Sequence, residues 1–289
     1  MKIGSQEHQE LFCQTFMASH RQYDPDTLPW PDLDDASLAR LQGIPFWGEA
    51  IRIERKAGLM VSTFAETVSN PRIREAIALQ GREEARHARL LECMTQRYGI
   101  ETTVPPTEAL PLNIEPAFVK FGYGECIDSF FAFGLFEIGR QSGFFPASLL
   151  AIFDPVLDEE ARHIVFFVNW IAYLQAIQGR GAPPLRATLT MWHYGRALLN
   201  LVHLLRSADT GGAGFTATGA SVVDMNLTPE KFLSTCLREN ARRMSVFDER
   251  LLRPQLLPSL GKISLSALKL LPQRQSRTQN ISHFTGSRQ

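Results

Sequence analysis

The peptide Glu-Glu-Ala-Arg-His occurs twice in the chain, at residues 83–87 and again at residues 159–163. Each copy contains a glutamate and a histidine three positions apart, Glu84 with His87 and Glu160 with His163. On a helix this spacing places a carboxylate and an imidazole on one face, one turn apart. Carboxylate oxygens combined with imidazole nitrogens suit iron or manganese. The repeat therefore predicts a duplicated helical hairpin that binds metal ions.

Both pairs lie on apolar stripes with the three- and four-residue spacing of a buried helix face. The first stripe consists of Ile73, Ile77, Gln80, Glu84, His87, Leu91, Met94 and Tyr98. The second consists of Phe153, Leu157, Glu160, His163, Ile164, Phe167, Ile171 and Leu174. A buried carboxylate is unfavourable unless it is paired or bound to a cation. We therefore expect both Glu-x-x-His pairs to point inward and to bind metal.

A site between four helices needs one carboxylate from each of the two remaining helices. The candidates on the first helix are Glu49, Glu54 and Glu66. On the first helix, Glu54 lies on an apolar stripe, and its neighbours one turn away are small or apolar. Glu49 shares its face with Arg52 and Lys56, which would repel a metal cation. However, Gly-Glu-x-Ile at Glu49 recurs at Glu125, at the offset that separates the two repeats. Repeat register therefore favours Glu49, but face polarity favours Glu54, and so do the similar distances of Glu54 and Glu84 from the turn near Asn70. We expect Glu54 to be the ligand.

On the third helix, Glu125 is the expected ligand, in the same order along the chain as the first-helix carboxylate. Asp128 follows one turn later and is a candidate exchangeable ligand or outer partner. Glu137 also has apolar neighbours, but Arg140 lies three positions on and is its expected partner. Glu137 therefore remains an alternative metal ligand on this helix.

The two imidazoles need hydrogen-bond acceptors that fix their tautomers. Asp158 and Asp128 are the expected acceptors. Arg86 and Arg162 each precede a site histidine, and we expect them either to brace carboxylates or to lie exposed on the outer helix face.

Helical patterns fill almost the whole sequence, and no alternating strand pattern is found, so we expect an all-α protein. Prolines, glycines and a Ser-Asn-Pro cap signal predict four long helices in residues 45–179, the last beginning after Pro146 and Asp154-Pro155. The expected units are an N-terminal helical extension (1–44), the four-helix domain (45–179), additional helices (180–249) and a basic tail (250–289).

Composition indicates a cytoplasmic protein. The 30 basic and 30 acidic residues give a formal net charge of +0, which gives no reason to expect a nucleic-acid partner. The four cysteines form no Cys-x-x-Cys pair. The polar N-terminus does not resemble a secretory signal. The most apolar run, residues 164–177, is shorter than the roughly 20 residues of a membrane span.

With its ligands in the order Glu54, Glu84 with His87, Glu125, and Glu160 with His163, the sequence resembles the ferritin-like di-iron carboxylate proteins. The resemblance covers residues 45–179. It implies a four-helix bundle with added N- and C-terminal helices, and a cofactor of two iron ions, or manganese or a mixed pair in their place. It also implies reaction with dioxygen.

Three functions fit this resemblance. The first is an oxygenase or oxidase that acts on a small, partly apolar organic substrate with electrons from an external reductase or ferredoxin. The second is a ferroxidase, peroxidase or iron-handling protein, and the third is a metal-binding partner protein without turnover. A phenylalanine-rich third helix favours the first, as the wall of a substrate channel or as plain core: Phe118, Phe121, Phe130, Phe131, Phe133 and Phe136.

Outside this region, His193 and His203 are expected to be structural. The tail contains an amphipathic stretch, SLSALKLL, and is expected to dock on its own domain, to be disordered, or to meet a membrane surface or an acidic partner. The sequence leaves the oligomeric state open, with a homodimer among the options.

Overall fold

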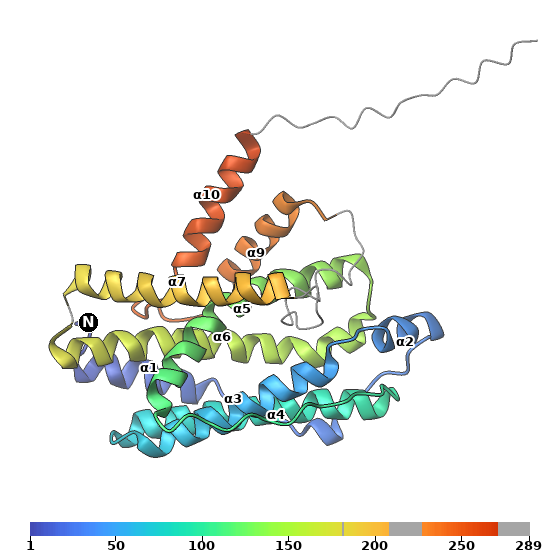
Figure 1. The fold of residues 1–289 in the computed structure, drawn as a ribbon, viewed down its shortest axis with the longest axis horizontal. Helices are drawn as coiled ribbons and strands as arrows, with labels where there is room; N and C mark the ends of the chain where they lie inside the picture. The colour runs from blue at the N-terminus through green and yellow to red at the C-terminus, as the bar shows by residue number, and fades with distance from the viewer. Residues whose placement is uncertain (181, 208–226, 271–289) are drawn as a thin grey trace, which may run out of the picture.

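The computed structural model describes residues 1–180, 182–207 and 227–270 (Figure 1). Within these ranges the chain is helical and contains no strand, which confirms the all-α prediction. The elements are α1 (Gln6–Ala18), the 3-10 turn η1 (Pro25–Thr27), α2 (Asp35–Gln42), α3 (Trp47–Thr67), α4 (Pro71–Arg97), α5 (Ile114–Ser142), α6 (Ala147–Gln175), the π-helical turn η2 (Ala176–Arg180), α7 (Pro183–Ser207), α9 (Pro229–Met244) and α10 (Leu256–Leu270).

Local sequence signals explain where these helices begin and end. The side chain of Asn70 accepts hydrogen bonds from the backbone N–H groups of Arg72 and Ile73, and Pro71 is the first residue of α4. Thr228 caps α9 in the same way, again followed by a proline. Gly143 ends α5 with a φ of 63°, a left-handed conformation that glycine adopts without strain.

The start of α6 differs from the prediction at its second proline. The helix begins at Ala147, directly after Pro146, and Pro155 lies inside it. An interior proline removes one backbone hydrogen bond and costs about 3 kcal/mol. The helix continues because its first turns bury Leu149 and Leu150, and each such side chain contributes about 1.5–3 kcal/mol when buried.

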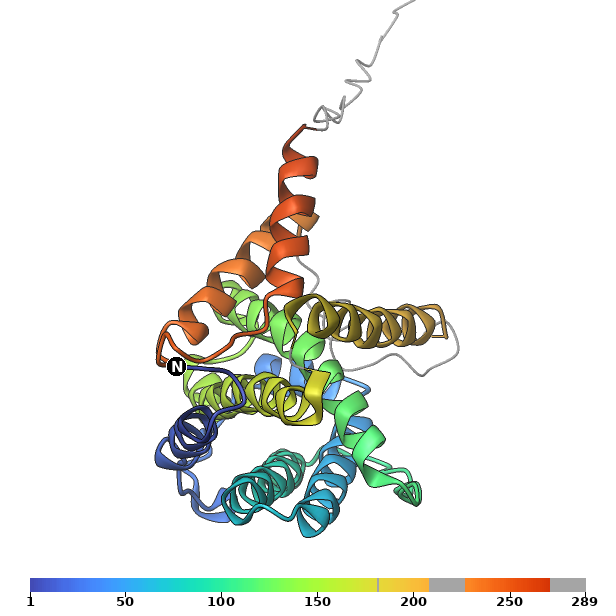
Figure 2. The same cartoon turned by 90° about the vertical axis from the view of Figure 1, so that its left-hand side faces the viewer.

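The four long helices α3 to α6 surround the predicted metal ligands. Helices α3 and α4 form a hairpin, α6 runs alongside them, and α5 crosses α6 obliquely (Figures 1 and 2). Helix α1 lies against α4 and α6, which contact each other little. Helices α7 and α9 pack on α5, and α10 packs on α9.

Two glycines bring the helices close together beside the site. At Gly58 a Cβ atom would lie 3.0 Å from the backbone nitrogen of Ala85, so only glycine allows α3 and α4 to approach this closely. At Gly122 a Cβ atom would lie 2.2 Å from the ring of Phe167, where α5 meets α6. The first contact is one turn from Glu54 and adjacent to Glu84.

The unit boundaries predicted at 44/45 and at 249/250 fall between helices, whereas the boundary predicted at 179/180 falls inside the turn η2. Part of the tail forms α10, whereas residues 271–289 and the glycine-rich segment 208–226 lie outside the described residues. None of the described helices is long and apolar enough to cross a membrane.

Candidate metal centre

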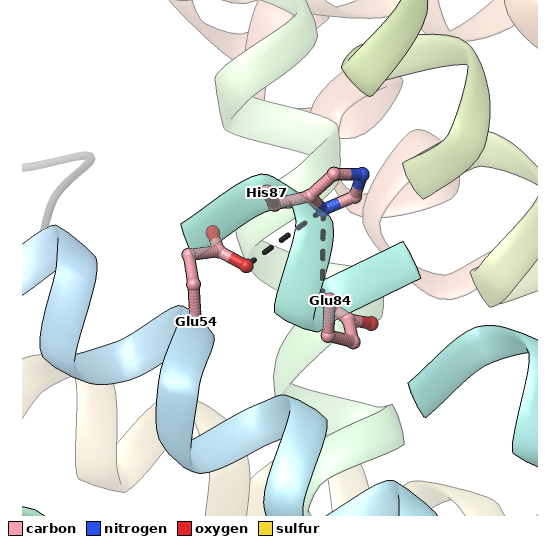
Figure 3. A group of neighbouring side chains, drawn as sticks. All are labelled: Glu54, Glu84 and His87. Carbon is pink, nitrogen blue, oxygen red and sulfur yellow. Dashed lines mark ion pairs between the residues drawn. The ribbon is translucent and has the colours of Figure 1, made fainter. Parts of the chain in front are cut away.

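The structure brings the six predicted ligands together from four helices. Two groups have ligand atoms within 4.8 Å of one another, Glu54 with Glu84 and His87, and Glu84 with Glu125 and His163. Glu84 belongs to both groups. Figure 3 shows the first group, in which the His87 ring faces a carboxylate from α3 and another from its own helix.

Glu84 and Glu160 lie between the two histidines in the same way. The two carboxylate oxygens of Glu84 are 3.1 Å from Nδ1 of His163 and 3.7 Å from Nδ1 of His87. The oxygens of Glu160 are 3.2 Å from Nδ1 of His87 and 3.6 Å from Nδ1 of His163. Each carboxylate therefore offers one oxygen to each imidazole, as a group bridging two cations would.

The other two carboxylates each belong to one half of the cluster. An oxygen of Glu54 is 3.7 Å from Nδ1 of His87. Glu125 groups with His163 on the opposite side of Glu84. The arrangement offers two sets of ligands, each with one histidine and one carboxylate of its own, that share Glu84 and Glu160.

Three buried atoms at this position have no hydrogen-bond partner, namely Nδ1 of His87, Nδ1 of His163 and Oε2 of Glu125. The nearby carboxylate oxygens are close to the two Nδ1 atoms but out of line for hydrogen bonds. Buried polar atoms without partners are rare in folded proteins. Their convergence on one point fits a site for metal cations.

The charges in the cluster perturb its titration strongly. Burial raises the pKa of Glu54 to about 7, with Glu84 and Glu160 adding to the rise and His87 opposing it. Burial, together with Glu160, raises the pKa of Glu125 well above its usual value. Without metal, the carboxyl group of Glu54 is therefore about half protonated at neutral pH, and the raised pKa of Glu125 favours its protonated form over that of an ordinary glutamate.

For the two histidines, burial and the neighbouring charges act on the pKa in opposite directions. Burial alone would lower the pKa of His87 and His163, but the surrounding carboxylates raise both pKa values well above the usual range. Burial alone would raise the pKa of Glu84, but His163 and His87 hold it below its usual range. A cation that displaced the imidazole protons would take over this stabilising role.

The outer ring nitrogens are held by two glutamates that the sequence reasoning missed. Nε2 of His87 lies 2.8 Å from Glu159, and Nε2 of His163 lies 2.9 Å from Glu83. With Nε2–H as the donor, each Nδ1 lone pair faces the cluster. The prediction of Asp158 as an acceptor was wrong, because that carboxylate pairs with Arg21 and Arg243 at the surface.

The arginines of the repeat brace these same outer glutamates. Arg86 donates to Glu159 at 2.6 Å, and Arg162 donates to Glu83. Both arginines are well buried, so the prediction that they brace carboxylates is confirmed and the exposed alternative is wrong. Glu83 of the first copy thus contacts His163 and Arg162 of the second copy. Glu159 of the second copy makes the matching contacts with His87 and Arg86 of the first.

The N-terminal segment covers this outer ring. Nδ1 of His20 is 2.6 Å from Glu83, and the hydroxyl of Tyr23 donates to Glu159 at 3.3 Å. The guanidinium of Arg162 also donates to the carbonyl of Phe16 at the end of α1. Helix α1 and the residues after it therefore close the histidine side of the cluster.

The competing carboxylates lie elsewhere. Glu49 accepts a hydrogen bond from Nε of Arg52 at 2.7 Å and stays outside the cluster, so the structure places Glu54 there instead. Glu137 pairs with Arg140 at 3.3 Å on the far part of α5.

Asp128 lies near the cluster without joining either ligand group. Its side chain is exposed, but the protein around its carboxyl group and the charge of Glu160 raise its pKa to about 6. It accepts no hydrogen bond from either site histidine among the described contacts, so the prediction that it fixes an imidazole tautomer was wrong.

The phenylalanines of α5 mostly form core. Phe118, Phe130 and Phe133 are buried, and the ring of Phe118 stacks on Phe64 at 4.4 Å. Phe121, Phe131 and Phe136 are half-buried. The interpretation as ordinary packing therefore holds for the three buried rings.

Of the two histidines predicted to be structural, His193 stacks on Tyr123 at 4.9 Å, which is a packing role. The side chain of His203 lies outside the described part of the structure.

Comparisons of the chain with models of protein families, with curated proteins and with solved structures give no significant match. The resemblance seen in the repeat therefore remains a prediction.

Proposed function

We propose that the protein is a non-haem di-iron protein of the ferritin-like type, with α3 to α6 as its metal-binding bundle. Its activity would be the oxidation of a small, partly apolar organic molecule by dioxygen. The supporting observation is the pair of unpartnered Nδ1 atoms, each facing one oxygen of Glu84 and one of Glu160. Surface ion pairs would not place six titratable groups around such atoms.

In this proposal Glu54 and His87 would hold one ion and Glu125 and His163 the other, and Glu84 and Glu160 would be shared between the two ions. A reduced pair of iron ions supplies electrons and open coordination positions for dioxygen. Manganese, or one ion of each metal, fits the same ligands.

The protein's own residues would position the ligands and control access. Glu83 and Glu159 fix the imidazole tautomers, and α1 keeps water from the histidine side. The side chains of Glu54 and Glu160 remain 26% and 15% exposed, whereas that of His87 is 2% exposed. Substrate and dioxygen would therefore approach from the side of the cluster where Glu54 of α3 and Glu160 of α6 are partly exposed.

Electrons for turnover would come from an external donor, because the four cysteines are separate buried thiols. A reductase or a ferredoxin is the expected class of donor. Burial raises the pKa of Cys13, Cys126 and Cys236 to about 12, so these thiols are protonated and unreactive at neutral pH.

The test is anaerobic loading with ferrous iron, metal analysis, and then measurement of oxygen uptake. We expect two iron ions per chain and rapid uptake of oxygen by the ferrous protein. His87→Ala and Glu160→Ala should lose stoichiometric binding while keeping helix content by circular dichroism. Wild-type protein that retained neither iron nor manganese would overturn the proposal. Fatty, aromatic and amine compounds form the substrate screen.

A second function, oxidation of ferrous iron itself, is favoured by Asp128. No cation among the described residues pairs with this exposed carboxylate. It lies close enough to Glu160 for the charge of Glu160 to raise the pKa of Asp128. Such a group could pass ferrous ions to the cluster. A ferroxidase would oxidise many iron ions per chain, and Asp128→Asn would slow that rate. A partner protein without turnover would bind iron but take up no oxygen.

A further inference from the structure

Helix α10 has two apolar faces, and the described structure covers only one of them. Leu257 and Gly261 are buried, and Gly261 lies against leucines of α9. On the other face, Leu260, Ile263 and Leu270 are 41%, 66% and 85% exposed. Their spacing of three and seven residues is that of a continuous helical stripe. Such a stripe is unfavourable in water unless it meets a partner.

Helix α7 shows the same property. Tyr194 and Ala197 are buried against the body of the protein. Leu185, Trp192 and Leu199 recur every seven residues on the opposite side and are 44%, 54% and 70% exposed. In both views, α7 and α10 lie on the side of the molecule away from α4 (Figures 1 and 2).

The charged residues in the sequences of these two helices are all basic. The segment 183–207 contains three arginines and no acidic residue, and the segment 250–289 contains seven basic residues and no acidic one. On α10, Lys262 and Lys269 are exposed and form no ion pair with the described residues. A second copy of the chain would bring the same positive charges together, so charge complementarity favours an anionic partner.

The residue types favour a lipid surface over an acidic protein. Protein interfaces are depleted in lysine, and leucine is under-represented among their dominant contacts. Helices that lie in a membrane interface combine leucine and tryptophan with lysine or arginine on the polar side. On α7, the guanidinium of Arg196 lies over the ring of Trp192 at 4.8 Å, which places an apolar ring beside a cation.

We propose that α7 and α10 dock the protein on a membrane surface that contains anionic lipids. The stripes defined by Leu185, Trp192 and Leu199 and by Leu260, Ile263 and Leu270 would enter the boundary between headgroups and acyl chains. The lysines of α10 would contact the anionic headgroups. The surface is separate from the metal ligands, so this docking does not depend on the proposed activity.

The test is co-sedimentation of the full chain with vesicles. Binding should be strong to vesicles of equal parts phosphatidylcholine and phosphatidylglycerol, weak to pure phosphatidylcholine, and weaker at 0.5 M salt. Ile263→Ser and Leu270→Ser should each reduce binding about tenfold. Lys262→Glu combined with Lys269→Glu should reduce it at least about tenfold.

Matched controls come from the opposite side of the molecule. Leu59 on α3 is 52% exposed, and Arg82 on α4 is an exposed arginine. Leu59→Ser and Arg82→Glu should leave vesicle binding unchanged, and all variants should keep the wild-type melting temperature within a few degrees.

Three results would overturn the docking proposal. One is equal binding to neutral and anionic vesicles. Another is a wild-type protein that is a dimer and does not bind vesicles, if the double variant Ile263→Ser, Leu270→Ser is a monomer. That result would assign the surface to a second copy of the chain. The last is no vesicle binding by a wild-type monomer.

Discussion

Replacing Glu159 by glutamine would test whether the outer glutamates control the metal ligands. Glu159 is 1% exposed and accepts hydrogen bonds from Nε2 of His87 at 2.8 Å, from Arg86 at 2.6 Å and from Tyr23 at 3.3 Å. Glutamine has nearly the same shape but no charge and only one acceptor oxygen. That oxygen cannot serve both His87 and Arg86 in their present positions.

The expected loss follows from the hydrogen bond to His87. A hydrogen bond to a charged group contributes about 1.5–3 kcal/mol, which corresponds to roughly 10- to 100-fold in affinity. Mutations of residues that orient metal-binding histidines have effects of the same size. Arg86 would also lose its shorter ion pair and keep only Glu83, at 3.8 Å. We therefore expect the free energy of unfolding of the metal-free protein to fall by about 3 kcal/mol.

Manganese binding, followed by electron paramagnetic resonance of the free ion, measures the effect without oxidation chemistry. Glu159→Gln should lower the affinity for the ion beside His87 more than the affinity for the ion beside His163. Glu83→Gln should mainly lower the affinity for the ion beside His163. Glu92→Gln on α4 is the control, because the partners of Glu92 within the described residues are the partly exposed Arg55 and Arg89, away from the cluster. Wild-type affinity for both ions in a folded Glu159→Gln variant would refute the assigned role.

Three further outcomes are expected. Glu54→Gln should weaken manganese binding at least tenfold whereas Glu49→Gln should not, and the reverse order in the same titration would place Glu49 at the site. Manganese affinity should rise between pH 6 and pH 8, by up to about tenfold per pH unit for each proton released on binding. The reason is that burial raises the pKa of Glu54 to about 7, and neighbouring carboxylates raise the pKa values of the two histidines. An affinity that did not change with pH would contradict this. Gly122→Ala should destabilise the protein by about 1–3 kcal/mol, because its Cβ atom would overlap the ring of Phe167. Gly124 has open space around it, so Gly124→Ala should stabilise α5 by up to about 1 kcal/mol. If urea unfolding gave both changes the same sign, the close contact at Gly122 would be contradicted.

Periodicity correctly predicted a buried face of α4. All eight residues of its stripe, from Ile73 to Tyr98, are buried, including Glu84 and His87. This works because a helix of 27 residues repeats its pattern many times, and a polar residue on such a stripe must have a partner. The boundary at Pro155 was less predictable, because the burial that overrides a proline depends on what packs against it.

The outer ring of the cluster could not be placed from local spacing. Asp158 and Glu159 are consecutive residues of α6, so the rotation of α6 about its axis decides which of them contacts His87. The spacing of residues in the sequence does not fix that rotation. His20 and Tyr23 lie more than 60 residues from their partners along the chain. One signal was present, because the first glutamate of the repeat recurs as faithfully as the ligands do.

The contacts explain why the whole five-residue peptide repeats. In each copy the second glutamate lies between the histidines, and the first glutamate holds the histidine and arginine of the other copy. The alanine is small: Ala85 lies against Gly58, and Ala161 is buried. A change in one copy would leave a buried charge of the other copy without its partner, which typically costs 3–5 kcal/mol. The repeat is therefore one interlocked unit, whose stability requires both copies even before a metal ion binds.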